Sequence, residues 1–192
     1  MKKLIPIIIL ALLLGGCAMY QVERTRLADN TFKCNMPSVT FKLSSDFVYI
    51  GEYNSKYGAK DVSPGSSDLG RTTTRVEEYY AWQSKDKSKL VVVYIVTLKN
   101  PQWRFSRKGL SKLEAVEIAG KEWHTKMWYG FRLNNEYYKR LTDIVPGASR
   151  SYKIVKEYRR VGISSNMMPK IYYLSKDGEG FTPDKDITIL AN

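Results

Sequence analysis

The clearest pattern along this chain is a pair of strand-like stretches joined by a short polar segment. Residues 72–83 are rich in β-branched and aromatic side chains, and alternation places Val76, Tyr80 and Trp82 on one face. Residues 90–98 are apolar on both faces, as a strand is when it lies in the middle of a sheet with other elements packed on each side. The sequence therefore predicts a β-hairpin that turns at 83–89 and whose second strand is central.

Further strands are predicted on both sides of this hairpin. Four segments have strand-like alternation or composition: residues 32–53, broken at 44–46, and residues 123–131, 170–174 and 187–190. Ala119-Gly120-Lys121 is typical of a tight turn before the second of these segments. Residues 54–70 combine glycine, proline and many serines, which predicts a long exposed loop.

Helical patterns fall in the second half of the chain. Apolar residues at 137, 138, 141, 144 and 145 share one helical face before Pro146-Gly147, which predicts a helix over 135–145. Ser111 and Glu114 have the spacing of a capping box, which predicts one or two helical turns after Ser111. Residues 152–161 fit either a helical stripe or a β-rich strand, and we favour the helix.

The order of these elements predicts the fold class. Strands come first, helices are mixed into the second half, and no β-α-β alternation appears, so we expect a single α+β domain with an antiparallel sheet and a few packed helices. The sequence of hairpin, central strand and tight turn into an aromatic strand is similar in pattern to PsbP-like α+β sandwich domains over about residues 36–135. This resemblance implies a fold and no functional residue.

The N-terminus has the three parts of an export signal. Lys2 and Lys3 precede an apolar run from residue 4 to residue 14, and small residues follow. As a helix, this run of eleven residues would span roughly 16 Å at about 1.5 Å per residue. The hydrocarbon core of a bilayer is about 30 Å thick, so the run is too short to cross it.

The residues that end this signal resemble the lipobox of bacterial lipoproteins. Leu14-Gly15-Gly16-Cys17 matches its pattern of leucine, two small residues and cysteine, with Gly15 where alanine or serine is more usual. The resemblance implies that residues 1–16 are removed and that Cys17 carries covalent lipid, the one prosthetic group we expect. Because Ala18 and not aspartate follows, it also implies the outer membrane, facing the periplasm, in a host with two membranes. Residues 17–30 then form a lipidated tether, and residues 31–192 form the domain.

The charge of the chain indicates which partners are available outside the cytoplasm. The sequence has 31 Lys and Arg against 19 Asp and Glu, and two of the lysines belong to the signal, so the mature chain keeps a net charge of +10. Anionic partners in the envelope are lipopolysaccharide and phospholipid phosphates and the carboxylates of peptidoglycan. Nucleic acid is not expected as a partner after export.

Few residues of the chain point to catalysis or to metal binding. With Cys17 lipidated, Cys34 has no disulfide partner and is expected to be a small buried hydrophobe. His124 is the single histidine, so zinc and copper sites and serine triads lack their ligands and base, and alternation places it on the solvent side of its strand. Glu77 and Glu78 point to opposite faces of one strand, so they cannot act together as a glycosidase pair.

The aromatic content, 14 Tyr and 4 Trp, is the one compositional excess. Trp82, Trp123 and Trp128 fall in predicted strands and suit a core, whereas residues 100–108 combine aromatic and cationic side chains on a predicted loop. The candidate binding residues are Trp103, Arg104, Arg107 and Lys108. The favoured hypothesis is a non-enzymatic, membrane-anchored envelope protein that binds or scaffolds another envelope component. The alternatives are a hydrolase of cell-wall or surface glycan and a small-ligand binding module.

Overall fold

The structure, a computed structural model, describes residues 23–59, 73–99, 105, 110–129, 136–146, 148, 152–160, 166–176 and 183–190. This described part is mostly β, with 67% of it in strands and 10% helical. Its strands form two antiparallel sheets, and the two α-helices within these ranges are short. The prediction of an α+β domain with packed helices is therefore wrong, because segments with helical spacing joined the sheets.

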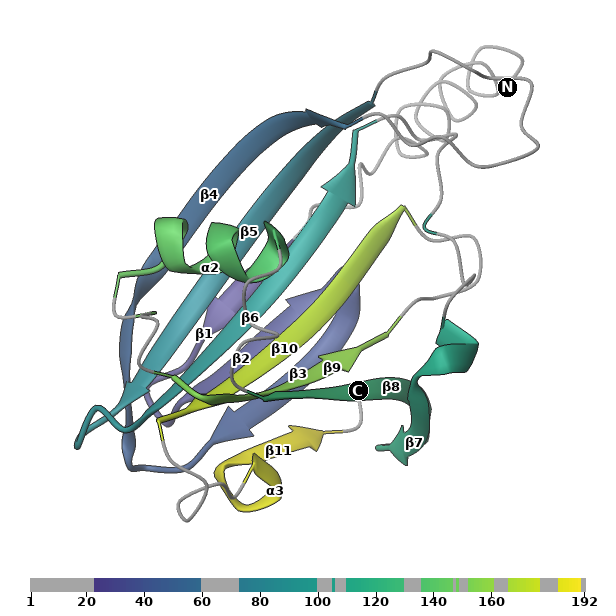
Figure 1. Cartoon of the computed structure of the whole chain (residues 1–192). Helices are drawn as coiled ribbons and strands as arrows, with labels where there is room; N and C mark the ends of the chain where they lie inside the picture. The colour runs from purple at the N-terminus through teal and green to yellow at the C-terminus, as the bar shows by residue number, and fades with distance from the viewer. Residues whose placement is uncertain are drawn as a thin grey trace, which may run out of the picture.

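The smaller sheet has four strands in the order β1-β2-β3-β11, and the larger has seven in the order β4-β5-β6-β10-β9-β8-β7 (Figure 1). We call them the small sheet and the large sheet. The strands of the small sheet are β1 (Arg24–Arg26), β2 (Thr31–Asn35), β3 (Ser38–Leu43) and β11 (Ile187–Leu190). The strands of the large sheet are β4 (Phe47–Ala59), β5 (Thr73–Ser84), β6 (Lys89–Leu98), β7 (Glu114–Ile118), β8 (Lys121–Tyr129), β9 (Ile154–Arg159) and β10 (Met167–Ser175).

An aromatic core fills the space between the two sheets. The ring of Phe32 lies 4.6 Å from that of Tyr80, and the ring of Phe41 meets Trp82 edge-on at 5.6 Å. Trp82 and Trp123 are fully enclosed here, at 0% and 1% exposure, so the interpretation of these two tryptophans as core residues is confirmed. Aromatic pairs of this geometry add to the apolar burial that holds a sandwich together.

A helix covers part of the other face of the large sheet. Helix α2 (Glu136–Ile144) lies across β4, β5 and β6, and its Leu141 packs with Val92 and Leu174 in a second core (Figure 1). The predicted helix over 135–145 is confirmed. So is the central hairpin, because β6 is buried on both faces, one against the small sheet and one against this second core.

Two predicted helical segments are instead strands. Residues 152–161 contain β9, which pairs with β10 and β8, and the capping-box segment is a short 3-10 helix (Leu110–Lys112) followed by β7. Val155 and Tyr158 face opposite sides of the large sheet and reach different cores. A strand with apolar residues on both faces can mimic a helical stripe, and pairing with two neighbours decided its structure. Strand β4 also runs through residues 54–59, which the sequence assigned to a loop.

The remaining strand predictions are confirmed. Strands β8, β10 and β11 match the segments at 123–131, 170–174 and 187–190, and Ala119 and Gly120 have the positive φ angles of a tight turn. The segment assigned to the tether contains β1, which pairs with β2 as an edge strand. None of the described helices is long and apolar enough to cross a membrane.

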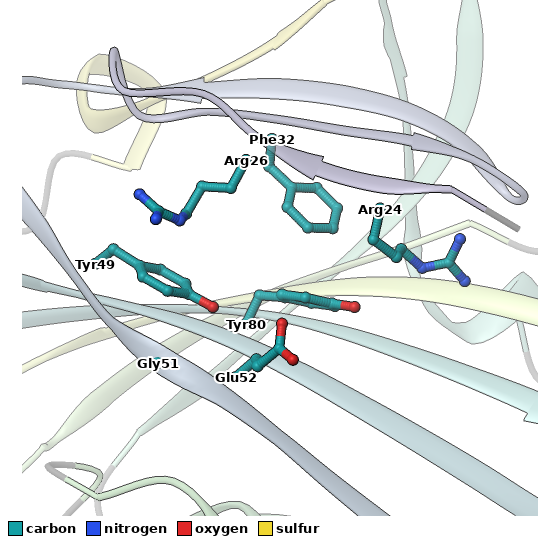
Figure 2. A pocket seen from close by; sticks show the side chains of 7 residues that line it. All are labelled: Arg24, Arg26, Phe32, Tyr49, Gly51, Glu52 and Tyr80. Atoms are coloured by element: carbon teal, nitrogen blue, oxygen red, sulfur yellow. The ribbon is translucent and has the colours of Figure 1, made fainter.

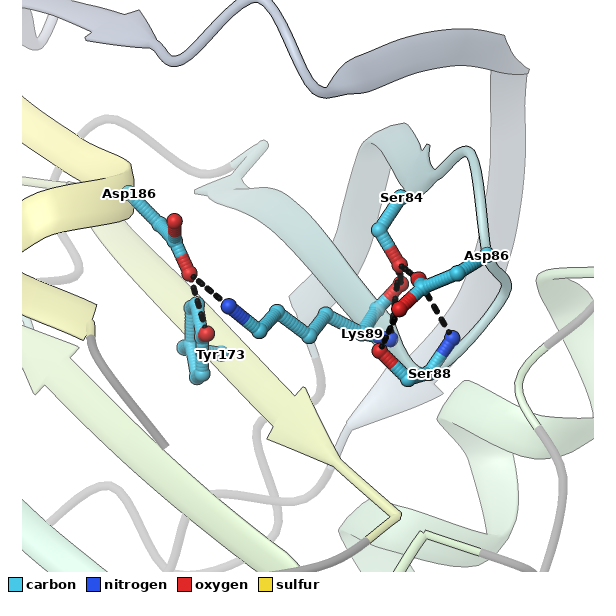
Figure 3. A network of polar contacts seen from close by, with 6 residues as sticks. All are labelled: Ser84, Asp86, Ser88, Lys89, Tyr173 and Asp186. Carbon is cyan, nitrogen blue, oxygen red and sulfur yellow. Dashed lines mark hydrogen bonds and ion pairs between the residues drawn. The ribbon is translucent and has the colours of Figure 1, made fainter. Parts of the chain in front are cut away.

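A polar network ties the hairpin to the small sheet (Figure 3). Helix α3 (Pro183–Asp186) precedes β11, and its Asp186 accepts a hydrogen bond from the Tyr173 hydroxyl and pairs with Lys89 at 2.8 Å. At the hairpin turn, Asp86 accepts hydrogen bonds from the hydroxyls of Ser84 and Ser88, which lower its pKa to about 2. Through Asp186, the ion pair and the Tyr173 hydrogen bond join α3, beside the small sheet, to β6 and β10 of the large one.

Candidate functional site

The best candidate for a ligand-binding site is a pocket at one open side of the sandwich. There β1 is the edge of the small sheet and β4 is the edge of the large sheet. Its volume is about 390 Å³, within the range of small-molecule pockets. We call it the edge pocket. Its lining residues come from β1, β2, β4 and β5, and are Arg24, Arg26, Phe32, Tyr49, Gly51, Glu52 and Tyr80 (Figure 2).

A β-bulge in β4 builds the floor of this pocket. In a regular strand, residues three apart such as Tyr49 and Glu52 would face opposite sides. Here the register between β4 and β5 shifts after Tyr49, so that Tyr49 lies opposite Trp82 and Glu52 lies opposite Tyr80. Both side chains therefore face the small sheet and enter the pocket. Bulges often aim side chains in this way beside functional sites.

Gly51 is required by the bulge. Its φ is +147°, and a Cβ there would lie 2.8 Å from the Tyr53 hydroxyl, which donates a hydrogen bond to the carbonyl of Ile50 at 3.2 Å. Replacing Gly51 with alanine is expected to lower the free energy of unfolding by about 1–2 kcal/mol, because the backbone is strained and the Tyr53 contact is displaced. Urea unfolding measures this loss. Gly120→Ala is the control for a positive φ that L residues can adopt, since Gly120 has a φ of +69° and a Cβ there meets nothing within 4 Å. A G51A loss no larger than that of G120A would contradict the combined strain of the backbone and the Tyr53 contact.

Arg24 is held at one end of the pocket. Its guanidinium contacts the Glu78 carboxylate at 3.1 Å, and the Tyr80 hydroxyl donates to the same carboxylate at 3.2 Å. The side chain of Arg24 is only 10% exposed. The charge of Arg24 is therefore already compensated by Glu78, and this end of the pocket is fixed.

Arg26 and Glu52, unlike Arg24, are not engaged in an ion pair with another described residue. The Arg26 guanidinium lies 4.4 Å from the centre of the Tyr49 ring, and neither residue has a hydrogen bond or ion pair among the described residues. The carboxylate of Glu52 lies beside Tyr80, below the Phe32 ring (Figure 2). The pocket thus presents, on an aromatic floor, a cation and a carboxylate that form no ion pair with any described residue.

The two tyrosines of the floor stay protonated. Burial raises the pKa of Tyr49 above its ordinary value, and the Glu52 carboxylate raises it further. Burial also raises the pKa of Tyr80, together with the nearby charge of Glu78. Both hydroxyls are therefore neutral hydrogen-bond donors at neutral pH, and Glu52 is the acidic residue among those that line the pocket.

The predicted lipidation site and the four predicted binding residues do not belong to the edge pocket as described. Cys17, Trp103, Arg104, Arg107 and Lys108 all lie outside the described residues. The residues that line the edge pocket were not predicted as a site. Arg24 and Arg26 fall in the segment assigned to a tether, and the shared orientation of Tyr49 and Glu52 depends on a bulge. A signal that could have indicated the bulge is Gly51, a glycine inside a strand pattern.

Cys34 and His124 are separated by the large sheet. Cys34 is 2% exposed in the core between the sheets, as predicted, and burial raises the pKa of its thiol to about 11. His124 is on the opposite face, opposite Arg159 in the strand register. The exposed residues Glu122 and Lys126 share this face of β8, as the alternation predicted, but the imidazole itself is only 11% exposed and lies 3.7 Å from the Glu122 carboxylate. Glu77 and Glu78 lie on opposite faces, as the alternation predicted.

A second group of charged residues is enclosed on that face of the large sheet. Lys170 and Glu157 are 3% and 4% exposed and pair at 3.6 Å, while Arg159 contacts Glu157 at 2.6 Å. Nearby, Glu77 accepts hydrogen bonds from the Tyr79 and Tyr94 hydroxyls. Each charge has a partner of opposite sign or a hydroxyl donor, and Lys170, Glu157 and Glu77 are buried while Arg159 is partly exposed, so we interpret this cluster as structural. No group of three or more metal-ligating side chains occurs within the described ranges.

A smaller hollow of about 240 Å³ lies between β11 and strands β7 and β9. Its lining is mainly apolar, and its one charged residue, Asp184, already accepts a hydrogen bond from Tyr158 and pairs with Lys156. The edge pocket is therefore the better candidate for a polar ligand.

No family model, curated protein or solved structure matches this chain. The candidate site consequently stands on its own geometry.

Proposed function

We propose that this chain is a lipid-anchored protein of the cell envelope that binds a small polar ligand at the edge pocket and does not transform it. One observation carries the proposal: Arg26 and Glu52 both line the edge pocket, above an aromatic floor. Neither of them has a hydrogen bond or an ion pair to another described residue. Charged groups left available in a concave site with aromatic walls are the usual recognition elements of ligand pockets.

The anchor rests on the sequence. Leu14-Gly15-Gly16-Cys17 ends an apolar run that is too short to span a bilayer, and the mature chain carries a net charge of +10 toward an anionic envelope. Arg24, the first residue of β1, follows Cys17 by seven residues. A segment of this length spans at most about 25 Å when extended, so a lipid on Cys17 keeps the edge pocket near the membrane.

The lining of the pocket favours binding over glycan hydrolysis. Glycosidases of the common kind need two carboxyl groups facing one substrate, about 5–10 Å apart. Glu52 is the one carboxylate among the lining residues of the edge pocket, and the adjacent Glu78 is engaged by Arg24 and Tyr80. A pocket with tyrosines and a single available carboxylate supports the small-ligand alternative among our hypotheses.

The proposal is tested first at the anchor. In cells given labelled palmitate, Cys17→Ser is expected to abolish labelling, because the lipid is attached through the Cys17 sulfur. Cys34→Ala is the matched control, since it removes the only other cysteine of the chain and should keep full labelling. Labelling that persists in C17S would contradict the lipoprotein assignment.

The same cells test the binding site. Photocrosslinking in the native envelope, followed by mass spectrometry of the purified protein, is expected to place adducts on β1 and β4 around the edge pocket. Arg26→Gln should remove them. Adducts confined to the opposite side of the sandwich, on β7 and β11, or no adduct at all, would refute the edge pocket as the binding site.

A further inference from the structure

The geometry of the edge pocket points to its ligand class: we propose that it binds a zwitterion, a molecule with a phosphate or carboxylate at one end and a primary ammonium at the other. This inference rests on the proposed function and makes it specific. It is carried by two opposite charges that enter the same pocket from different sheets, Arg26 from β1 and Glu52 from β4.

The anionic end of the ligand belongs at Arg26. The guanidinium carbon lies 4.4 Å over the centre of the Tyr49 ring, at cation–π distance, and no residue within the described ranges accepts a hydrogen bond from its N–H groups. The N–H groups of a guanidinium lie in its plane and form a fork that matches an oxyanion. An oxyanion can therefore accept two parallel hydrogen bonds from a side chain whose orientation is already restricted.

The ammonium end belongs at Glu52. Its carboxylate has no ion-pair partner among the described residues and lies close enough to affect the pKa of both Tyr49 and Tyr80. A primary ammonium placed there would donate to the carboxylate and face the electron-rich tyrosine rings. The same carboxylate would repel a ligand that is only anionic.

The charge balance around the pocket supports a ligand of zero net charge. Arg24 and Arg26 are matched by Glu52 and Glu78, but only the Arg24–Glu78 pair is in contact. A zwitterion satisfies the two remaining charges together, whereas a simple anion would satisfy Arg26 and leave Glu52 desolvated beside it. An unpaired charge at a site that loses water is costly, so the preference should be large.

Two sources in the envelope carry this chemistry. One is a lipid headgroup such as that of phosphatidylethanolamine, which the proposed anchor would bring within reach. The other is a soluble amino compound, such as a short peptide with free termini. The titrations below include both, because the pocket recognises the shared pair of charges.

The test is calorimetric titration of the full-length lipidated protein in detergent. Phosphoethanolamine is expected to bind at least tenfold more tightly than inorganic phosphate or ethanolamine. Glu52→Gln should reduce phosphoethanolamine to the affinity of phosphate, and Arg26→Gln should weaken it at least tenfold. The controls are Lys33→Gln on β2 and Glu117→Gln on β7, which each remove one exposed charge outside the pocket and should change nothing.

Two further ligands distinguish a lipid headgroup from a soluble amino compound as the natural ligand. Tighter binding to phosphatidylethanolamine vesicles than to phosphatidylglycerol vesicles, lost in E52Q, would identify a headgroup; stronger binding of alanylalanine than of phosphoethanolamine would identify a soluble amino compound. Phosphate that binds as well as phosphoethanolamine, in wild type and E52Q alike, would overturn the zwitterion. It would leave the proposed function intact if palmitate labelling and the crosslinks on β1 and β4 persist.

Discussion

Replacing Glu157 with alanine is expected to lower the free energy of unfolding by about 3–5 kcal/mol, the usual cost of removing one member of a buried ion pair. Glu157 is 4% exposed and accepts contacts from Arg159 at 2.6 Å and from Lys170 at 3.6 Å. Its removal leaves the buried ammonium of Lys170 without its carboxylate, next to the partly exposed guanidinium of Arg159. Chemical denaturation at pH 7 measures the loss.

Replacing the cationic partner, Lys170, should affect stability differently from replacing Glu157. Lys170→Met keeps the Glu157–Arg159 pair and fills the same space with an apolar side chain, so stability should be unchanged or higher. A loss in K170M as large as that in E157A would mean that the Lys170 charge itself stabilises the fold, contrary to this account.

The pH dependence of stability tests whether the buried charge of Lys170 destabilises the fold. Burial lowers its pKa to about 8, against about 10.4 in an unfolded chain, although the Glu157 carboxylate acts in the other direction. Between these two pH values the unfolded state binds more protons, so this group makes stability rise with pH. Wild type should therefore gain stability relative to K170M from pH 8 to pH 10. Other groups, such as Cys34, titrate in both proteins and cancel in this difference.

Replacing Asp186 with alanine is expected to cost about 2–3 kcal/mol. Asp186 is the acceptor for Tyr173, whose side chain is fully buried, and for Lys89 at 2.8 Å (Figure 3). Without it, the buried Tyr173 hydroxyl loses a charged acceptor, and the link between the hairpin and the small sheet is broken. Thermal unfolding followed by circular dichroism would show the change.

Asp184 supplies the matched control in the same short helix. Its side chain is 81% exposed, so its ion pair with Lys156 is screened by water, and water can replace it as the acceptor for the Tyr158 hydroxyl. Asp184→Ala should therefore change stability by about 1 kcal/mol or less. Equal losses in D184A and D186A would show that the helix as a whole matters and that the buried carboxylate does not.

Periodicity in the sequence predicted most of the strands but not the number of layers. The β6 segment was identifiable because it is apolar on both faces, and α2 because its apolar residues end at Pro146. Residues 154–159 were assigned to a helix because a strand covered on both faces has no alternation to distinguish it. That cover comes from the small sheet on one side and the second core on the other, which are tertiary features that a local pattern does not contain.

The sequence did not predict the edge pocket, for a related reason. Its charged residues come from β1 and from the bulged part of β4, which are far apart in the sequence. A one-residue change of register reversed the side to which Glu52 points, and no alternation rule predicts where a register changes. The residues that composition did single out, Trp103 and its basic neighbours, remain a prediction.

The position of β1 has a mechanical consequence. This strand has three residues, pairs only with β2, and is the first element after the proposed anchor, so tension on the tether is borne first by these few pairs. Peeling β1 away would withdraw Arg24 and Arg26 together and dismantle one wall of the pocket, while the cores on both faces of the large sheet stay closed. In a membrane-attached protein, pulling would then empty the site without unfolding the domain.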